Sequence, residues 1–171
     1  MFTEADCQGR PDWHLLQNGA VNLFHDPEIL ARARADLASL GYELAEISCR
    51  ESMSSFERQF SDLLHWEDQF GYAPWSGKLD ALNDGMRDYP FGASERSALV
   101  IDGFHRLASK DAAYAHGLLD ILESAARDHL LFGRTLVALI QTDDRSYHAS
   151  GLGARRANWN SREWRPLRPY D

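Results

Sequence analysis

The chain has 171 residues, of which 44% are hydrophobic and 26% are charged, and its formal net charge is −8. This composition is typical of one globular domain with appendages. No apolar run approaches the ~20 residues needed to span a bilayer, and the acidic segment 1–6 lacks the order of charges found in a signal peptide. Two isolated cysteines, Cys7 and Cys49, indicate a reducing cytoplasm rather than a disulfide scaffold.

The charge is unevenly distributed along the chain. Residues 145–171 hold six arginines and two acids, which gives this tail +4 and leaves −12 for residues 1–144. A body with that charge repels nucleic acid and attracts basic proteins. The sequence therefore favours a basic protein as the partner, and neither a nucleic acid nor a membrane is expected to bind.

The first expected element is a β-hairpin, because Asn18-Gly19 lies between the partly apolar runs 13–17 and 20–24. A helix should follow, with Asp26 as its N-cap, and end at Gly41. Residues 1–41 are thus expected to form a hairpin-plus-helix extension that packs on the core.

Three predicted strands, at 42–48, 98–102 and 135–140, alternate with helices along residues 42–143. One predicted helix begins at Ser52, Ser54 or Ser55, and the longest runs from Asp111 to Phe132, where Gly133 should end it in a left-handed conformation. The alternation predicts an α/β domain with a small parallel sheet flanked by helices. Residues 144–171 are expected to form an irregular tail rich in Arg and Trp.

An acidic helix is predicted after an irregular loop at 67–74 and reaches Tyr89. Asp80, Asp84 and Asp88 recur every fourth residue and share one face, while Leu79, Leu82, Met86 and Tyr89 lie on the opposite face. Like charges at this spacing cost about 0.2–0.5 kcal/mol per pair in an isolated helix. Two interpretations remain open: a solvated surface, or an acidic surface for a cationic partner.

The basic tail also admits two interpretations. Residues 155–165 interleave arginines with Trp159 and Trp164, a pattern that occurs in nucleic-acid binding. Alternatively, the tail packs its tryptophans on the domain and pairs its arginines with the acidic body. We favour the second interpretation because the rest of the chain opposes a polyanion.

No motif indicates a metal, a cofactor or an enzyme. The seven histidines show no ligand-type spacing, and the chain lacks a nucleophile elbow, a phosphate-binding glycine loop and a Cys–His signature. Carboxylates such as Asp80 and Asp84 can hold Mg²⁺ or act as general acid and base. Their stretch supplies no neighbouring His or Lys with an obvious catalytic job, so a small carboxylate-dependent hydrolase remains only an alternative.

The stretch WSGKLDALND at residues 75–84 resembles the motif of the barstar family of ribonuclease inhibitors, which has an aromatic pair, Gly, Asn, an apolar residue and Asp-Ala-Leu-x-Asp. The order of the later elements also fits, and the resemblance covers roughly residues 42–142. The sequence departs from the motif in three places. The motif Asn is absent, so that either one residue is deleted or Lys78 replaces the Asn and the Gly has shifted. Asn83 replaces a large aromatic residue of the best-known member, and Asp88 is an additional acid.

The resemblance implies a small parallel sheet and a helix that, with its preceding loop, plugs the basic active site of a small secreted ribonuclease. It implies that Asp80 and Asp84 are the motif acids, and that Asp84 reaches into the phosphate-binding site. Tyr89 matches an aromatic position of the family beyond the helix, and Asp128 falls near an acidic position on the last long helix. Pro74 and Trp75 lie where the family has its loop aromatics. The candidate partner-binding residues are Tyr72, Pro74, Trp75, Gly77, Leu79, Asp80, Asn83, Asp84, Asp88, Tyr89 and Asp128.

The leading hypothesis is a cytoplasmic inhibitor of a barnase-like ribonuclease with an immunity or antitoxin role. A binding or regulatory module of the same fold for another basic protein is the second hypothesis, and the hydrolase is the third. The first two require Asp80 and Asp84 on an open surface, whereas the third requires a pocket or a metal around them.

Overall fold

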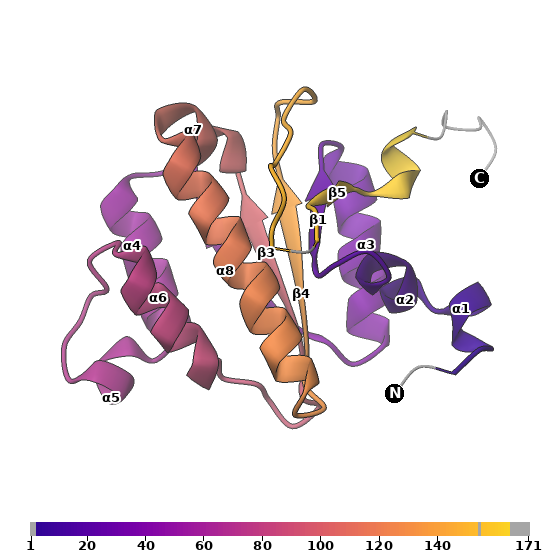
Figure 1. Ribbon diagram of the computed structural model, residues 1–171, viewed down its shortest axis with the longest axis horizontal. Coiled ribbons are helices and arrows are strands. Elements are labelled where there is room, and N and C mark those ends of the chain that lie inside the picture. Colours follow the sequence, from indigo (N-terminus) through magenta and orange to yellow (C-terminus); the bar gives the residue numbers. More distant parts are fainter. Residues whose placement is uncertain (1–2, 154, 165–171) are drawn as a thin grey trace.

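The computed structural model describes residues 3–153 and 155–164, and a five-stranded sheet forms its centre (Figure 1). The sheet order is β2-β3-β4-β1-β5, and all neighbouring strands are parallel. The strands are β1 (Val21–Phe24), β2 (Glu43–Ser48), β3 (Arg96–Asp102), β4 (Thr135–Gln141) and β5 (Asn158–Trp159). The predicted α/β class, and the predicted pairing of 42–48, 98–102 and 135–140 in one parallel sheet, are therefore confirmed.

Burial along the strands follows their positions in the sheet. All four residues of β1 are buried, and in β4 only Thr135 is not. Such continuous burial is expected for strands covered on both faces, which is why their sequences read as unbroken apolar runs. At the edge, β2 has exposed residues and only one buried position.

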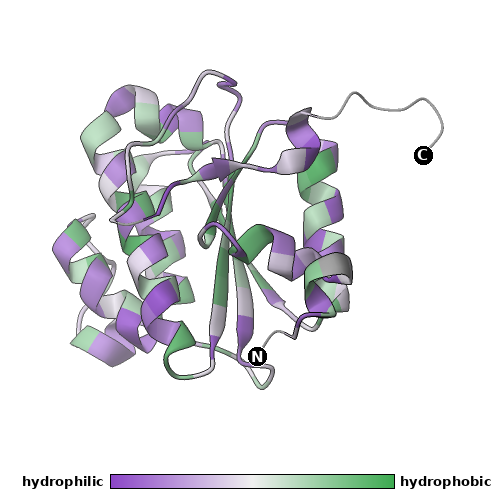
Figure 2. Cartoon of the chain, turned by 45° about the vertical axis from the view of Figure 1, so that its right-hand side comes forward, coloured by the Kyte–Doolittle hydropathy of each residue, from purple (hydrophilic) through white to green (hydrophobic). Residues whose placement is uncertain are grey.

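Helices cover both faces of the sheet (Figure 1). α3 (Pro27–Ser39) covers one face, α4 (Met53–Leu63) and α8 (Ala112–Leu130) cover the other, and α6 (Leu79–Gly85) packs against α8. Right-handed crossovers require this arrangement, because the connection from β1 to β2 runs across the sheet in the opposite direction to those from β2 to β4. The central strands are largely hydrophobic, and hydrophilic residues gather on the outer sides of the helices (Figure 2). The remaining helical segments are α1 (Asp6–Gly9), α2 (Pro11–Leu16), α5 (Trp66–Phe70), η1 (Met86–Asp88), α7 (Phe104–Lys110) and η2 (Ser161–Trp164).

Polar side chains cap the three longest helices. Asp26 accepts a hydrogen bond from the Glu28 backbone nitrogen at 2.8 Å, as the sequence predicted for α3. Ser52 is the residue that caps α4, among the three serines considered. Asp111 caps α8 through the backbone nitrogen of Tyr114 at 2.9 Å. Each cap satisfies a backbone donor that would otherwise lack a partner at the start of its helix.

The predicted N-terminal hairpin is wrong. Residues 11–16 form α2, with Pro11 in its first turn, and β1 pairs in parallel with β4 instead of folding back on α2. Asn18-Gly19 is the turn between them, and Gly19 has φ +136°. A Cβ at Gly19 would lie 3.1 Å from a carboxylate oxygen of Glu123. The Asn18-Gly19 signal therefore marks a real turn. The apolar residues after it form β1, which is buried between the parallel strands β4 and β5.

The described part of the C-terminal tail, up to residue 164, contains regular structure that was not expected. Its residues 158–159 form β5 on the outer edge of β1, and η2 follows. Trp159 packs against the core and Arg162 pairs with Asp36 at 3.1 Å, in line with a tail that folds back on the domain. Trp164 is 70% exposed. The predicted basic residues Arg165 and Arg168 lie outside the described residues.

One buried carboxylate ties β1 to α8. Glu123 is 5% exposed, and a single oxygen, Oε2, accepts from the backbone nitrogens of Ala20 at 2.7 Å and Val21 at 3.2 Å. Burial raises the pKa of Glu123 above its ordinary value of 4.5, while the two hydrogen bonds and the charges of Arg155 and Arg127 oppose the rise.

This pKa shift predicts a pH dependence that Glu123→Gln should remove. Because the native pKa is raised, the contribution of Glu123 to stability is present below about pH 4.5 and is lost as pH rises through the native value. The glutamine oxygen can keep both backbone hydrogen bonds. The unfolding free energy of the wild type should therefore fall relative to Glu123→Gln over that pH interval, as chemical denaturation at several pH values would measure. Parallel curves for the two proteins would contradict the prediction.

α8 ends at Leu130, two residues before the predicted end at Phe132, and Gly133 closes the turn after it in the predicted left-handed conformation, with φ +80°. The backbone nitrogens of Gly133 and Arg134 donate to the carbonyls of Leu130 and His129, each at 3.1 Å, which is the Schellman pattern. A Cβ at Gly133 would meet nothing within 4 Å. Gly133→Val should therefore destabilise the fold by about 1 kcal/mol or more through backbone strain alone. Thermal unfolding would measure this loss, and Gly133→Asn, which tolerates the conformation, should lose less.

Candidate protein-binding site

The acidic segment lies on the outer side of the helical layer formed by α4 and α8. Leu82 and Met86 are fully buried and Tyr89 is 3% exposed, so the opposite side of the segment faces solvent. The single helix predicted to reach Tyr89 is shorter than expected: α6 ends at Gly85, and one 3-10 turn, η1, follows. The chain becomes extended at Tyr89 (φ −51°, ψ 128°) because the next residue is Pro90.

Three carboxylates of this segment are exposed. Asp84 lies in the last turn of α6 with 57% of its side chain exposed, and its Oδ1 is 3.7 Å from Nη1 of Arg87. Asp80 in α6 and Asp88 in η1 make no side-chain hydrogen bond or ion pair to other described residues. The acidic side chains are thus presented to solvent from a helix whose other side is anchored in the core.

The segment before α6 is less irregular than predicted. Its residues 66–70 form the short helix α5. The residues on either side of this helix, His65 with φ 50° and Gly71 with φ 73°, have the left-handed conformation. Trp66 is 1% exposed, and its ring centroid lies 4.4 Å from that of Phe70 and 6.0 Å from that of Trp75. A helix of little more than one turn is too short to show a periodic pattern in the sequence.

Trp75 anchors this segment to α4. The side chain is fully buried, with ring centroids 6.1 Å from Phe56 and 5.6 Å from Phe60. Its backbone nitrogen donates to Oγ of Ser61 at 2.6 Å, and its indole Nε1 donates to the carbonyl of Lys78 at 2.9 Å. Because Lys78 is the residue that precedes α6, Trp75 fixes the start of the acidic helix.

The other sequence-predicted residues occupy three kinds of position. Tyr72, at 48% exposure, and Pro74 are exposed on the loop, whereas Leu79 is half-buried against α8. Gly77 has φ +76°, and a Cβ there would lie 2.7 Å from Oε1 of Glu57. Tyr89 is internal, and its hydroxyl shares a 2.7 Å hydrogen bond with Ser97.

A groove connects the acidic segment with the end of α8. It has a volume of about 550 Å³ and brings Asn83 together with Asp128, two candidates that lie far apart in the sequence. Asp80, Asp84 and Asp88 lie outside it. Asp128 is exposed and forms no side-chain ion pair within the described part of the chain.

Two further residues of the groove, Leu131 and Phe132, were not singled out by the sequence reasoning. Their side chains are 80% and 76% exposed. A signal was present: the buried stripe of α8 reaches His129, and on a helix the next two positions in phase are Phe132 and Gly133. Leu131 is out of phase with the stripe, and the turn at Gly133 carries Phe132 away from the core.

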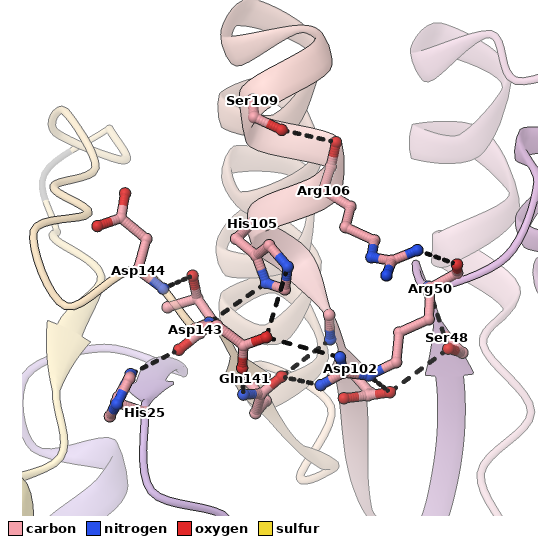
Figure 3. A network of polar contacts seen from close by, with 12 residues as sticks. His25, Ser48, Arg50, Asp102, His105, Arg106, Ser109, Gln141, Asp143 and Asp144 are labelled. Atoms are coloured by element: carbon pink, nitrogen blue, oxygen red, sulfur yellow. Dashed lines mark hydrogen bonds and ion pairs between the residues drawn. The ribbon is translucent and has the colours of Figure 1, made fainter.

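A second cluster of polar residues lies at the carboxyl edge of the sheet, where open α/β sheets usually bind ligands (Figure 3). Arg50 donates from Nε to Oδ2 of Asp102 at 2.7 Å and from Nη2 to Oε1 of Gln141 at 3.1 Å. The same Gln141 oxygen accepts from the backbone nitrogen of Gly103 at 3.0 Å. These contacts join the ends of β2, β3 and β4.

Asp143 completes the cluster. A 2.7 Å hydrogen bond from Nε2 of Gln141, with the nearby charges of His105 and Arg50, lowers the pKa of Asp143 below its ordinary value. The guanidinium of Arg50 faces both Asp102 at 2.7 Å and Asp143 at 3.6 Å, so its charge is compensated within the cluster, and these contacts hold the ends of three strands together. Its residues come from separate segments with no common spacing, and no sequence pattern marked them.

Other ligand classes were considered over residues 3–153 and 155–164. No group of three His, Cys, Asp or Glu side chains in this part of the chain is arranged to hold a metal ion. None of the helices described there has both the length and the apolar character required to cross a bilayer.

Comparison with protein families shows what the chain is similar to. A family model described as Barstar (barnase inhibitor) matches residues 44–141, which is more than half of the 171-residue chain. The match includes α6, its preceding loop, the strands β3 and β4 and the long helix α8. Comparison with curated proteins gave no match, and comparison with solved structures gave none. On its fold, its acidic helix and this family match, the chain belongs to the barstar (barnase inhibitor) family.

Proposed function

We propose that this protein inhibits a small basic, barnase-like ribonuclease by plugging its active site with α6 and the loop before it. The observation that carries the proposal is the exposed row of Asp80, Asp84 and Asp88 on a segment with a buried back. This segment lies within the stretch that matches a family described as barnase inhibitors, and the resemblance assigns Asp80 and Asp84 to the two motif acids. A cytoplasmic immunity or antitoxin role goes with this function, and the two free cysteines agree with a reducing compartment.

The physical argument rests on charge and rigidity. A ribonuclease must hold cations where the RNA phosphate lies, and a carboxylate that enters this place accepts charge-assisted hydrogen bonds. Asp84 is at the centre of the acidic row, and α6 is held by Leu82 and Met86, so little ordering is needed on binding. The −12 charge of residues 1–144 would steer the basic partner toward the inhibitor.

Of the remaining candidate partner-binding residues, some would contact the ribonuclease and others support the backbone of the binding surface. Tyr72, Pro74 and Asn83 offer accessible surface beside the acids, whereas Trp75 and Tyr89 act by holding the backbone from inside. In this proposal residues 42–143 carry the binding surface. Residues 1–41 and 144–171 are appendages that complete the sheet with β1 and β5.

The test is inhibition of a small basic secreted ribonuclease, measured with a fluorogenic RNA substrate. Wild-type protein should inhibit in a stoichiometric titration, and the triple variant Asp80→Asn, Asp84→Asn, Asp88→Asn should not. A control with the same change in charge, Glu4→Gln, Glu28→Gln, Glu43→Gln, replaces exposed acids elsewhere and should still inhibit. Equal inhibition by the two triple variants, or none by the wild type, would contradict the proposal.

The two alternatives predict different results. A module for another basic protein would bind that protein through the same acids without inhibiting the ribonuclease, and the replacement of the motif aromatic by Asn83 is the observation that favours a changed target. A carboxylate-dependent hydrolase is not favoured, because Asp80 and Asp84 are exposed on the helix surface rather than enclosed with other polar groups.

A further inference from the structure

An exposed apolar patch lies where α8 ends. Leu130, Leu131 and Phe132 are consecutive, and 51%, 80% and 76% of their respective surfaces are exposed. The patch is held in place, because the backbone nitrogen of Phe132 donates to the carbonyl of His129 at 2.9 Å and the Schellman turn at Gly133 follows. Adjacent exposed apolar side chains on an ordered turn mark an interaction surface.

The patch borders the groove beside the acidic segment. Asn83, Met86 and Arg87 line one side of the groove, and Ala125, Asp128 and Phe132 line the other. The two sides are joined by a 2.8 Å hydrogen bond between Nε2 of His129 and the carbonyl of Met86. With a volume of about 550 Å³, the groove has room for a large side chain.

The charges at the groove indicate the chemistry of its occupant. Arg87 is engaged with Asp84 at 3.7 Å, and Arg134 is engaged with Glu95 at 3.8 Å. Asp128 has no such ion pair among the described residues. Among the charged residues that line the groove, the uncompensated charge is therefore the carboxylate of Asp128, which is complementary to a cation.

We propose that the groove and the side chains of Leu131 and Phe132 are an apolar extension of the acidic surface, and that a basic protein binds both. The occupant is an apolar side chain of that partner, next to the cationic site that receives Asp84. This inference rests on the proposed function and adds a selectivity element: a partner needs an apolar protrusion beside its cations, and basic charge alone does not give tight binding.

The experiment measures Kd for a small basic secreted ribonuclease at low and high salt, with wild type, Phe132→Ser, Leu131→Ser and Asp84→Ala. Each apolar substitution should weaken binding about tenfold, to a similar degree at both salt concentrations, because the lost term is hydrophobic. The effect of Asp84→Ala should be larger. Leu44→Ser on β2, an exposed leucine outside the groove at 37% exposure, is the matched control and should bind as the wild type does.

Calorimetry gives a second readout. Burial of apolar surface makes the heat-capacity change of binding negative, so Phe132→Ser should reduce its magnitude while Asp84→Ala leaves it nearly unchanged. Thermal unfolding of Phe132→Ser should match the wild type, since the side chain is exposed.

The outcomes separate the two proposals. If Asp84→Ala weakens binding while Phe132→Ser and Leu131→Ser do not, the apolar extension is wrong and the proposed function stands. If the wild type does not bind the ribonuclease, both are wrong for this class of partner. Self-association of the wild type that Phe132→Ser abolishes would assign the patch to a second copy of the chain and overturn the inference.

Discussion

Asp84→Ala is expected to weaken binding to a basic ribonuclease by about 2–5 kcal/mol, more than any other single substitution in the acidic row. A carboxylate at the centre of the interface is desolvated on binding, and its removal leaves the partner's cations buried without a counter-charge. Asp80→Ala and Asp88→Ala remove charges nearer the rim and should cost less. Isothermal titration or inhibition kinetics with the three single variants measures this order.

Folding should be nearly unaffected by the same substitution. The ion pair between Asp84 and Arg87 is exposed on both sides, so it contributes between 0 and about 1 kcal/mol, and removal of one acid relieves repulsion within the row. Association of the wild type should also slow as salt rises. Equal effects below 1 kcal/mol at all three positions, with no salt dependence, would identify the acidic row as an ordinary solvated surface.

Trp75→Ala is expected to destabilise the fold by about 3–5 kcal/mol, the usual cost of removing a buried large aromatic side chain. The substitution deletes ring contacts to Phe56 and Phe60 and the hydrogen bond to the carbonyl of Lys78. Chemical denaturation measures the loss. Ribonuclease binding should weaken as well, because the residue that precedes α6 is released from α4.

Two variants make this prediction specific. Trp75→Phe keeps part of the ring packing but loses the indole hydrogen bond, so its loss of stability should be intermediate. Tyr72→Ala removes a half-exposed aromatic side chain of the same loop and should change the unfolding free energy little. If Tyr72→Ala and Trp75→Ala lost similar amounts of unfolding free energy, burial of Trp75 in the core would not explain its contribution to stability.

The parts of the fold that the sequence predicts well depend on local rules. Asp26 before Pro27, and Gly133 between an amphipathic helix and an apolar run, mark helix ends through neighbouring atoms alone, and both are observed. The parallel sheet followed from the order of elements and their apolar runs. The hairpin at Asn18-Gly19 failed because the partners of β1 come from far along the chain: Val21 pairs with Ala138, and Asn22 with Asn158.

In the candidate site too, features set by neighbouring residues could be predicted from the sequence, whereas features that depend on distant segments could not. The acidic row lies within one short stretch of the chain, α6 and η1, so its exposure could be predicted from the spacing of the apolar residues. The burial of Trp75 depends on its packing against α4, which is distant in the chain. Asn83 and Asp128 line the same groove because α8 crosses α6. The family resemblance identified Asp80 and Asp84 as the motif acids from their positions in the sequence. The exposure of Phe132 depends on the turn that follows it, which the spacing of apolar residues does not describe.

The position of β1 has a consequence for shortened forms of the chain. The family match ends at residue 141 and begins at residue 44, so a fragment of that length would lack both β1 and β5. Its sheet would stop at β4, a strand in which every residue after Thr135 is buried, and this would create an apolar and unpaired edge. Such edges recruit strands from other chains. The fragment should therefore form oligomers or aggregates, and the N-terminal segment protects against self-association by covering that edge.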